Sequence, residues 1–452
     1  MASTNLTRTF TGANGGSNWT TSFWIKRSKI TLQQDIFEAH SSSTYHTDFL
    51  FKSDDTIQFM SFNGSTSFKL KTNRVFRDTN AYYHIVLQYI ASGDSGVYAK
   101  IYVNGVQETS LSVNTQGAGG TQWNNNCLWT IGSDYAGLND FDGCISHFHH
   151  CDGSVLAPTV FGSTDSTTGE WQINTSPSFT LGTNGFTILK DGNTITDQSA
   201  NSNNWSLANG TLTKTEDNPS NVFATLNPLV TYGTNQNALS EGNNTLTGIS
   251  YHRPSPPTIS VNSGKWYFEA KALSGTSTKW WIGLCDTEYD TNNQGATSST
   301  ANYIWGYDGT TNAVNQRSQI IYGNDLRDGG SNIAISGIFS AGTIAVNDIY
   351  AMAVDLDNQK VWYSKNGVWN NGSGGESTTF NASTPDSTNI DAGRDYLIGI
   401  GGENSKWSIN YGNGYFGTTA VSSAGTNASG IGIFEYDCPT GYTALSTKGL
   451  NL

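Results

Sequence analysis

The sequence is poor in cysteine, proline, charge and long apolar runs, and each shortage excludes a class of protein. Its 452 residues include 5 cysteines and 9 prolines, and 13% of them are charged. Such an odd and sparse set of cysteines argues against a disulfide framework and suits a protein made in a reducing cytoplasm. No apolar run approaches the roughly 18 residues of a membrane span. The first residues, MASTNLTRTF, lack the basic and apolar regions of a signal peptide, so we expect none.

Basic residues are also scarce. The chain has 23 Lys and Arg against 36 Asp and Glu, which gives a net charge of −13. A protein that binds duplex nucleic acid needs a positive footprint, and no cluster of basic residues is present. We therefore expect neither a nucleic-acid partner nor membrane insertion, and an acidic, polar surface that favours solubility.

Glycine and aromatic residues are abundant. The chain has 50 Gly, 13 Trp, 21 Tyr and 20 Phe, and it shows no long helical spacing of apolar residues. Many aromatics, few long aliphatic runs and frequent turn signals are typical of an all-β sandwich protein. The length allows two or three domains with substantial cores.

The clearest strand signal lies in residues 347–369, NDIYAMAVDLDNQKVWYSKNGVW. Tyr350, Met352, Val354 and Leu356 alternate with smaller or polar residues, which is the period of a strand with one buried face. Asn366-Gly367 predicts a two-residue hairpin turn. Residues 100–109, KIYVNGVQET, repeat the strand and turn far upstream. We therefore expect two β-sandwiches in tandem, with residues 350–356 and 361–363 buried. The strand motifs also predict three core tryptophans, Trp266, Trp362 and Trp407.

Two families share motifs with this chain. SFWIKRS, YYHIVLQ, KIYVNGV, WTIGSD and FDGCISHFHH follow the order of laminin-G-like, concanavalin A-type jelly rolls, which residues 1–157 resemble. Residues 244–418 resemble a SPRY domain, since its GDxhxhxhDhdxxxhxFxxNG pattern appears as NDIYAMAVDLDNQKVWYSKNG, with Asn347 where Gly is usual. The closing NFG-type strand appears as Asn410-Tyr411-Gly412.

The resemblance implies an all-β chain of two tandem concanavalin A-like jelly-roll β-sandwiches with a short-strand connector. We expect the laminin-G-like sandwich at residues 1–157 and the SPRY-like sandwich at residues 244–418. Residues 158–243 would form a connector packed between the domains, because they hold large apolar residues such as Trp171 and Phe186. Residues 419–452 would form a C-terminal extension.

The ending, IFEYDCPTGYTALSTKGLNL, is similar to the close of virion proteins of tailed phages that combine these two domain types. The resemblance implies synthesis in the host cytoplasm, a place on the virion surface and a homo-oligomer. It also implies other virion proteins and host cell-surface glycan as partners. The leading hypothesis is a non-enzymatic tail fibre or fibre-like protein. The alternatives are a capsid-decorating or tail-assembly protein and, more remotely, a glycan depolymerase.

Aromatic residues in loops are the candidates for sugar binding, because sugars stack their apolar faces on such rings. Trp305, Tyr307, Arg317 and Tyr322 lie in or beside expected loops of the second sandwich. SPRY domains bind partners through loops on one face, which favours these four. Trp123 and Tyr135 are the corresponding candidates in the first sandwich. The alternative is that Trp305 and Tyr307 are core or edge residues of a strand, YIWGYD.

Metal sites have weaker candidates. Laminin-G-like domains sometimes hold calcium at a rim of loops with oxygen ligands, which makes Asp134, Asp140 and Asp142 candidates. Ordinary turn acids are the alternative, and we expect no required cofactor.

The stretch 144–151, CISHFHHC, has the ligand types of a zinc site. On a straight strand, however, His147, His149 and Cys151 share one face, and Cys144, Phe148 and His150 the other. Unless a bulge alters this alternation, the stretch is better explained as a core strand.

No catalytic residues are expected, since the sequence holds neither a nucleophile elbow nor a phosphate loop. A depolymerase would need a carboxylate pair. Asp286, Glu288 and Asp290 alternate along one stretch, and Asp286 with Glu288 is the pair that we nominate. A solvated loop is the favoured interpretation of this stretch, and a calcium-binding loop is a further alternative.

Overall fold

The computed structural model describes residues 4–12, 16–190, 194–230, 236–249, 253–275, 280–287, 318–322, 325–328, 331–334, 345–370, 375–388 and 390–452. The side chains of residues 318–334 lie outside this description. Strands dominate, and the short helical elements among these residues include η1 (Pro158–Val160) and η2 (Gly449–Asn451). The predicted all-β fold is therefore confirmed. Within the described residues, no helix has the length and apolar character needed to cross a membrane.

Two compact units make up the chain. The first holds Met1–Lys214 and Asn218–Ser220, and the second holds Thr215–Asp217 and Asn221–Leu452. Of the expected connector, residues 158–214 thus lie in the first unit and residues 221–243 in the second.

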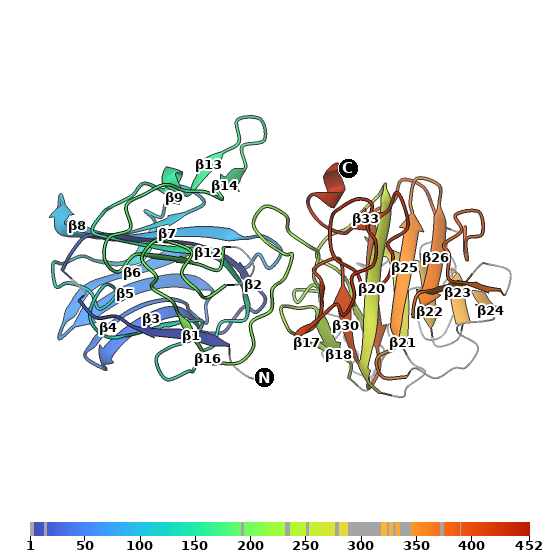
Figure 1. Cartoon of the computed structure of the whole chain (residues 1–452), viewed down its shortest axis with the longest axis horizontal. Coiled ribbons are helices and arrows are strands. Elements are labelled where there is room, and N and C mark those ends of the chain that lie inside the picture. The colour runs from blue at the N-terminus through green and yellow to red at the C-terminus, as the bar shows by residue number, and fades with distance from the viewer. Residues whose placement is uncertain are drawn as a thin grey trace. The chain divides into compact units, whose positions relative to one another are not determined.

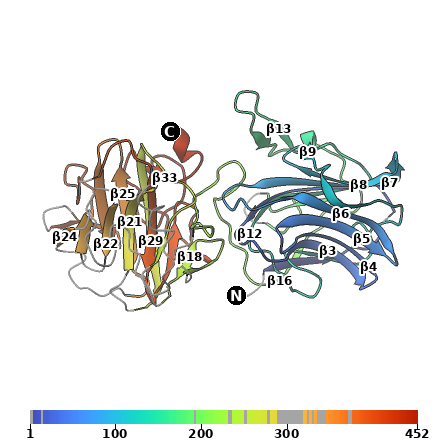
Figure 2. The ribbon, with the colours of Figure 1, turned by 180° about the vertical axis from the view of Figure 1, so that it is seen from behind.

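Among the described residues, two antiparallel sheets form the first unit (Figures 1 and 2). The larger sheet contains, in spatial order, β10 (Leu111–Thr115), β6 (Thr66–Val75), β5 (Thr56–Asn63), β4 (Tyr45–Phe51), β3 (Gln34–Ser42), β11 (Leu128–Ile131), β1 (Asn5–Thr9) and β16 (Ser206–Asn209). The smaller sheet contains β15 (Phe186–Ile188), β12 (Gly143–Asp152), β2 (Trp19–Arg27), β7 (Tyr83–Asp94), β8 (Val97–Val103) and β9 (Val106–Gln107). A short hairpin of β13 (Gly162–Thr164) and β14 (Trp171–Ile173) follows.

An aromatic core fills the space between these two sheets. Alternate residues of β3, β4 and β5 place Phe37, Phe49 and Phe59 in it, each fully buried. The Phe37 ring stacks on Phe49, with 5.9 Å between the ring centroids. Each such ring contributes about 1.5–3 kcal/mol through burial, so the alternation itself decides which face of the larger sheet is the core.

Residues 158–181 cover the outer face of the smaller sheet. Trp171 donates a hydrogen bond from Nε1 to His84 Nδ1 over 2.9 Å, and the two rings stack. Phe161 and Phe179 contact the ring of His149 with centroid distances of 5.7 and 5.8 Å. The first part of the expected connector therefore packs against the first sandwich.

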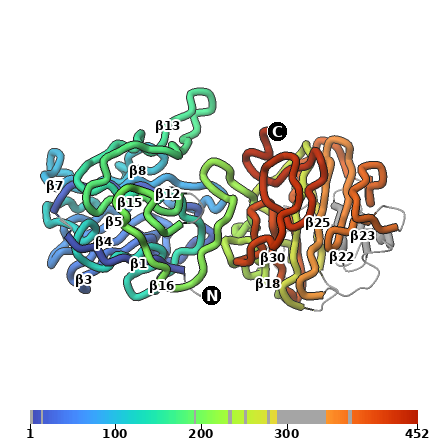
Figure 3. Tube along the Cα trace, viewed as in Figure 1, coloured from blue at the N-terminus to red at the C-terminus, as the bar shows by residue number. Residues whose placement is uncertain are grey.

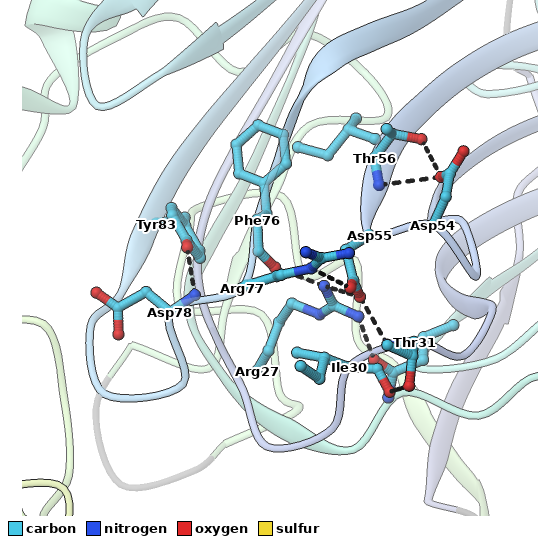
Figure 4. A network of polar contacts seen from close by, with 12 residues as sticks. Arg27, Ile30, Thr31, Asp54, Asp55, Thr56, Phe76, Arg77, Asp78 and Tyr83 are labelled. Carbon is cyan, nitrogen blue, oxygen red and sulfur yellow. Dashed lines mark hydrogen bonds and ion pairs between the residues drawn. The ribbon is translucent and has the colours of Figure 1, made fainter. Parts of the chain in front are cut away.

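A buried ion pair joins the two sheets at one end (Figure 4). Arg27, on β2, contacts Asp55 between β4 and β5, with 3.1 Å from Nη1 to Oδ1 and no exposure of either side chain. Arg27 Nη1 also donates to the carbonyl oxygen of Phe76 over 2.6 Å. Burial works to raise the pKa of Asp55, but donors from Thr31 and the two guanidinium groups of Arg77 and Arg27 hold that pKa below its ordinary value. The pair therefore stays charged inside the sandwich.

Within its described residues, the second unit is also a sandwich. Its larger sheet contains β17 (Ala238–Ser240), β18 (Thr245–Thr247), β30 (Lys406–Asn410), β20 (Lys265–Ser274), β25 (Ile349–Asp355), β26 (Lys360–Lys365), β27 (Val368–Asn370) and β28 (Glu376–Ser377), with β33 (Thr443–Ala444) parallel to β20. Its smaller sheet contains β19 (Arg253–Ser255), β29 (Tyr396–Gly402), β21 (Trp280–Asp286), β22 (Ser318–Tyr322), β23 (Asp325–Asp328) and β24 (Ser331–Ala334). β31 (Tyr415–Phe416) and β32 (Thr419–Ala420) form a separate hairpin.

The predicted meander is β25, β26 and β27. The expected burial of residues 350–356 and 361–363 is confirmed, and so is that of Trp266, Trp362 and Trp407. The expectation of a single buried face is wrong, because every residue of β25 is buried. Ala351 and Ala353 lie in a second cluster. That cluster includes Phe434, Cys438 and Tyr442, which belong to the C-terminal residues 419–452.

Residues 419–452, the C-terminal segment, run beside this sheet, where β33 pairs with β20 (Figure 3). A buried carboxyl group on β20 binds the segment. Glu269, on β20, accepts hydrogen bonds from the backbone N–H groups of Glu435 and Tyr436 over 2.8 and 2.9 Å. The Tyr267 hydroxyl donates to the same carboxyl group over 3.0 Å. Residues 419–452 are thus part of the second unit's packing.

The Arg27–Asp55 pair generates a stability prediction. Replacing Arg27 by Ala leaves the buried Asp55 charge with Arg77 and Thr31 as its remaining partners, so we expect a loss of about 3 kcal/mol in the free energy of unfolding, at the lower end of the range for a broken buried pair. The matched control is Arg74→Ala, because Arg74 pairs with Glu108 over 2.9 Å with 47% of its side chain exposed. That variant should lose no more than about 1 kcal/mol. Urea unfolding of the full chain measures both, and equal losses would contradict the role assigned to Arg27.

Candidate functional site

Polar side chains line the outer face of the larger sheet in the first unit. They alternate with the core phenylalanines, so they point away from the core. The pairing of five neighbouring strands places them in rows. We call the central one the acidic row, and it consists of Thr130, Glu38, Asp48, Met60 and Lys69.

Two further rows flank the acidic row. The imidazole row consists of Leu128, His40, His46 and Phe62. On the other side lie Asp35, Leu50, Gln58 and Lys71. Figure 2 shows β3, β4, β5 and β6 side by side as a curved layer.

Each imidazole of the imidazole row contacts a carboxyl group of the acidic row. His40 Nδ1 lies 3.1 Å from Glu38 Oε1, with side-chain exposures of 14% and 9%. His46 Nε2 lies 3.6 Å from Asp48 Oδ2, with exposures of 19% and 8%. These groups are packed closely enough to be held in place, and yet they still reach solvent. They offer hydrogen-bond donors and acceptors at fixed positions.

Tyr135 adds an aromatic ring to this face. It follows β11, and its backbone N–H donates to Glu38 Oε2 over 2.9 Å. Its ring stacks on His40 with 3.5 Å between centroids and an angle of 5°. Since 50% of Tyr135 remains exposed, the ring presents a flat apolar surface beside the carboxyl groups.

Burial controls the protonation of the carboxyl groups. It raises the pKa of Asp48 to about 8, with the neighbouring charges of Asp35 and Glu38 adding to the effect. Burial likewise raises the pKa of Asp35 to about 7, against an opposing hydrogen bond from Gln33. Near neutral pH the Asp48 carboxyl group therefore keeps its proton, so that it both donates and accepts.

Two buried polar atoms of the acidic row lack a hydrogen-bond partner among the described residues. They are Asp48 Oδ1 and Thr130 Oγ1, and they flank Glu38 in the row. An unpaired buried polar atom costs free energy, so a ligand that supplied a partner to either atom would gain binding energy.

Of the six sequence-predicted ligand residues, Tyr135 lies at this face and Trp123 does not. Trp123 is fully buried, and its ring stacks on Phe37 and Trp129 at centroid distances of 4.1 Å. Its Nε1 donates to Thr21 Oγ1 over 2.9 Å inside the core. The prediction that Trp123 binds a ligand is therefore wrong, because no face of the ring is accessible.

The other four ligand candidates remain predictions. Trp305, Tyr307 and Arg317 lie outside the described residues. Tyr322 is the last residue of β22, whose backbone pairs with β21 and β23, and its side chain is not described.

The three candidate calcium ligands do not form a common site among the described residues, and two of them have other partners. Asp134 Oδ1 accepts from the N–H groups of Ala136 and Leu138 over 2.9 and 2.7 Å. Asp142 pairs with Lys29 over 2.7 Å. Neither these two nor Asp140 belongs to a group of three or more acidic, His or Cys side chains that could hold a metal, within the residues the structure describes. The calcium prediction thus has no ligand set in that part of the chain, and Asp134 fits the alternative of a turn acid.

The His and Cys stretch is the buried strand β12, as the favoured interpretation predicts. A bulge between Ser146 and His149 puts Cys144 on the same face as His149 and Cys151, so the predicted alternation is wrong for Cys144. Burial lowers the pKa of His149 and of His150 to about 3, which keeps both imidazoles neutral.

The prediction of a solvated loop at residues 286–290 is wrong for Asp286. Asp286 ends β21, is 1% exposed and pairs with Arg394 over 3.3 Å. Its burial follows from pairing along the whole length of β21 with β29. Glu288 and Asp290 lie outside the described residues.

The acidic row was missed, although the sequence holds a signal for it. Glu38 and His40 on one side, and His46 and Asp48 on the other, are arranged symmetrically about Ser43. A tight hairpin at residues 43–44 pairs His40 with His46 and Glu38 with Asp48. The mirrored pattern of acid and imidazole would have indicated this, had the hairpin been recognised.

Comparison with known proteins agrees with the two sandwiches. Residues 3–161 match the family described as the concanavalin A-like lectin/glucanases superfamily, and residues 265–385 match the SPRY domain. The chain therefore contains a concanavalin A-like domain followed by a SPRY domain, which confirms both predicted domain types. No curated protein matches the chain.

Several solved structures are similar to parts of the chain. A candidate carbohydrate binding protein from Bacteroides ovatus is 16% identical, with 47% of this chain and 60% of that one covered and a TM-score of 0.30. The SPRY domain of human HERC1 is 12% identical, with 37% and 87% covered and a TM-score of 0.23. Domain 4 of AbnA, an arabinanase from Geobacillus stearothermophilus, is 17% identical, with 32% and 64% covered and a TM-score of 0.25. At these levels of similarity, none of them assigns a ligand to this chain.

The raised pKa of Asp48 generates a prediction on stability and pH. The ordinary Asp pKa is 3.8 and the folded value about 8, so the folded protein holds a proton that the unfolded chain loses. The contribution of this group to the free energy of unfolding therefore falls as the pH rises between these values.

Asp48→Asn should remove that slope. We expect the variant to be more stable than the wild type above about pH 8, by roughly 1–3 kcal/mol, with a smaller difference near pH 5. Urea unfolding at several pH values measures the difference, and Asp94→Asn is the control, because Asp94 is 61% exposed beside Lys100. Parallel curves for the wild type and Asp48→Asn would contradict the assigned pKa.

Proposed function

We propose that this chain is a non-enzymatic glycan-binding protein and that the outer face of the larger sheet in its first unit binds the sugar. The observation that carries the proposal is the pairing of two carboxyl groups with two imidazoles beside a half-exposed tyrosine ring. A flat apolar ring next to a few fixed polar groups is the combination that sugar recognition needs. The match to a lectin/glucanase superfamily supports it.

The aromatic ring and the carboxyl groups of the site would bind different parts of the sugar. A sugar ring would stack on the exposed side of Tyr135, whose other side is held by His40. Its hydroxyl groups would bind Glu38 and Asp48, and hydrogen bonds to such groups contribute about 1.5–3 kcal/mol each when charged. One such site would bind weakly, so several copies on one particle would raise the avidity.

One observation favours hydrolysis as a second candidate function. Glu38 and Asp48 are cross-strand partners, and Asp48 keeps a proton near neutral pH. A glycosidase uses two neighbouring carboxyl groups of which one is protonated. New reducing ends after incubation with a bound glycan, lost in Glu38→Gln, would support this glycan depolymerase activity and contradict the non-enzymatic proposal.

We further propose that the protein is a homo-oligomeric appendage of a phage virion, a tail fibre or a fibre-like protein made in the host cytoplasm. The support is the similarity of residues 433–452 and of the domain pair to virion proteins. Its partners would be other virion proteins and host cell-surface glycan. The alternative is a capsid-decorating or tail-assembly protein that binds only virion proteins.

Immunogold labelling of purified particles tests the virion proposal. We expect label at the distal end of the tail, because a host-binding protein must reach the cell first. Label between capsomers would support the decorating alternative, and particles without label would contradict the virion proposal as a whole.

A tyrosine variant tests glycan binding. Tyr135→Ala removes the ring but keeps the backbone N–H that Glu38 accepts, so we expect at least about tenfold weaker binding on a glycan array. Tyr45→Ala is the matched control, because Tyr45 is 43% exposed and precedes His46 on β4, which directs it to the opposite side of the sheet. It should bind as the wild type does. Unchanged binding by Tyr135→Ala, or no binding by the wild type to any glycan, would contradict the proposed site.

A further inference from the structure

Acidic side chains outnumber lysines around the acidic row. Asp35, Glu38 and Asp48 lie in adjacent rows of one sheet face. Of the nearby lysines, Lys52 already donates to Gln33 over 3.0 Å. The titratable and polar groups that surround Asp48 are Asp35, Glu38 and His40 on β3, His46 on β4, Gln58 on β5, Lys69 on β6, and Lys52 and Asp134 in loops.

Thr130 provides a separate indication of a ligand. It lies next to Glu38 in the acidic row, it is 2% exposed, and its Oγ1 has no hydrogen-bond partner among the described residues. On the far side of Glu38, Asp48 Oδ1 is also buried and has no hydrogen-bond partner among the described residues. The acidic row thus holds three acceptors in sequence, namely a hydroxyl, a carboxylate and a carboxyl oxygen.

We propose, on the basis of the proposed function, that this face selects glycans with a free amino group, whose ammonium binds Glu38 and Asp48. An ammonium has three N–H donors, and adjacent strands lie about 4.8 Å apart, so one ammonium can donate to these two neighbouring carboxyl groups at once. A hydroxyl group offers one donor, and an N-acetyl group carries no charge. A carboxylated sugar meets like charge in the row. The sugar ring that bears the ammonium stacks on Tyr135, where the aromatic face also attracts the cation.

Proton release accompanies this binding. Burial raises the pKa of Asp48 to about 8 and that of Asp35 to about 7, so part of the site is protonated before the ligand arrives. An adjacent ammonium favours the ionised carboxylate, and the displaced proton leaves to solvent. Affinity for an amino sugar therefore rises from about pH 5 to about pH 7 and falls again where the amine itself loses its proton.

Calorimetry with three tetrasaccharides tests the selectivity. The full chain is titrated with the tetramers of glucosamine, of N-acetylglucosamine and of glucose at low salt. We expect the glucosamine tetramer to bind at least about tenfold more tightly than the other two, because it alone forms charge-assisted hydrogen bonds. Titrations in two buffers of different ionisation enthalpy should show net proton release with this tetramer alone.

Variants distinguish binding by the acidic row from a general attraction of the ammonium groups to the negatively charged surface. Asp48→Asn and Glu38→Gln should each remove the preference for the glucosamine tetramer, while Asp94→Asn in the smaller sheet should keep it. Thermal unfolding shows whether each variant is folded. If one acidic-row variant does not fold, the other still tests the inference. If both acidic-row variants keep the preference, the inference is wrong.

The remaining outcomes distinguish this inference from the proposed function. Equal binding of the three tetramers, or tighter binding of an oligogalacturonate, with loss of binding in Tyr135→Ala, overturns the amino-sugar inference and leaves glycan binding intact. Absence of binding to every glycan of a broad array, or unchanged binding by Tyr135→Ala, overturns both.

Discussion

Strand register is the constraint on which both sandwiches depend, and an Asn-Gly turn fixes it in each unit. Side chains alternate along a strand, so a slip of one residue would exchange the core face for the outer face. Asn104 and Asn366 both have positive φ angles, 49° and 50°, as the hairpin turn requires. Asn104 Oδ1 accepts from the N–H of His84, whose carbonyl accepts from Asn104 N. Asn366 makes the same two bonds with Ile349. Register is thus fixed by four hydrogen bonds at two equivalent turns.

A covering segment packs against the same turn in each unit. A Cβ atom at Gly105 would clash with the ring of Trp171, and one at Gly367 would lie 2.6 Å from the ring of Tyr436. Trp171 belongs to residues 158–181 and Tyr436 to the C-terminal segment, and each segment covers the outer face of the sheet that bears the turn. In the first unit this leaves the smaller sheet covered, while the larger sheet keeps partly exposed polar groups on its outer face. The fold thereby decides which sheet can receive a ligand.

Local patterns in the sequence predicted the fold well, whereas the site depended on contacts between distant residues. The burial of residues 350–356 and the two Asn-Gly turns were predicted from signals within a few residues, and both are confirmed. Trp123 stands in a polar stretch that resembles an exposed loop, and only the tertiary path places its ring between Phe37 and Trp129. The second buried face of β25 is covered by residues about 80 positions later, which periodicity cannot indicate.

Two aspartates of the first unit differ in how fully the fold provides hydrogen-bond partners for their buried carboxyl groups. Asp55 is buried with donors from Arg27, Arg77 and Thr31, and its pKa is low because those donors satisfy the charge. Asp48 is buried nearly as deeply, but its Oδ1 has no partner among the described residues and its pKa is raised. An apolar residue at position 48 would avoid that cost, as Leu50 does two residues along the same face. A carboxyl group that weakens the fold at this position is the kind of group that the proposed glycan site would use.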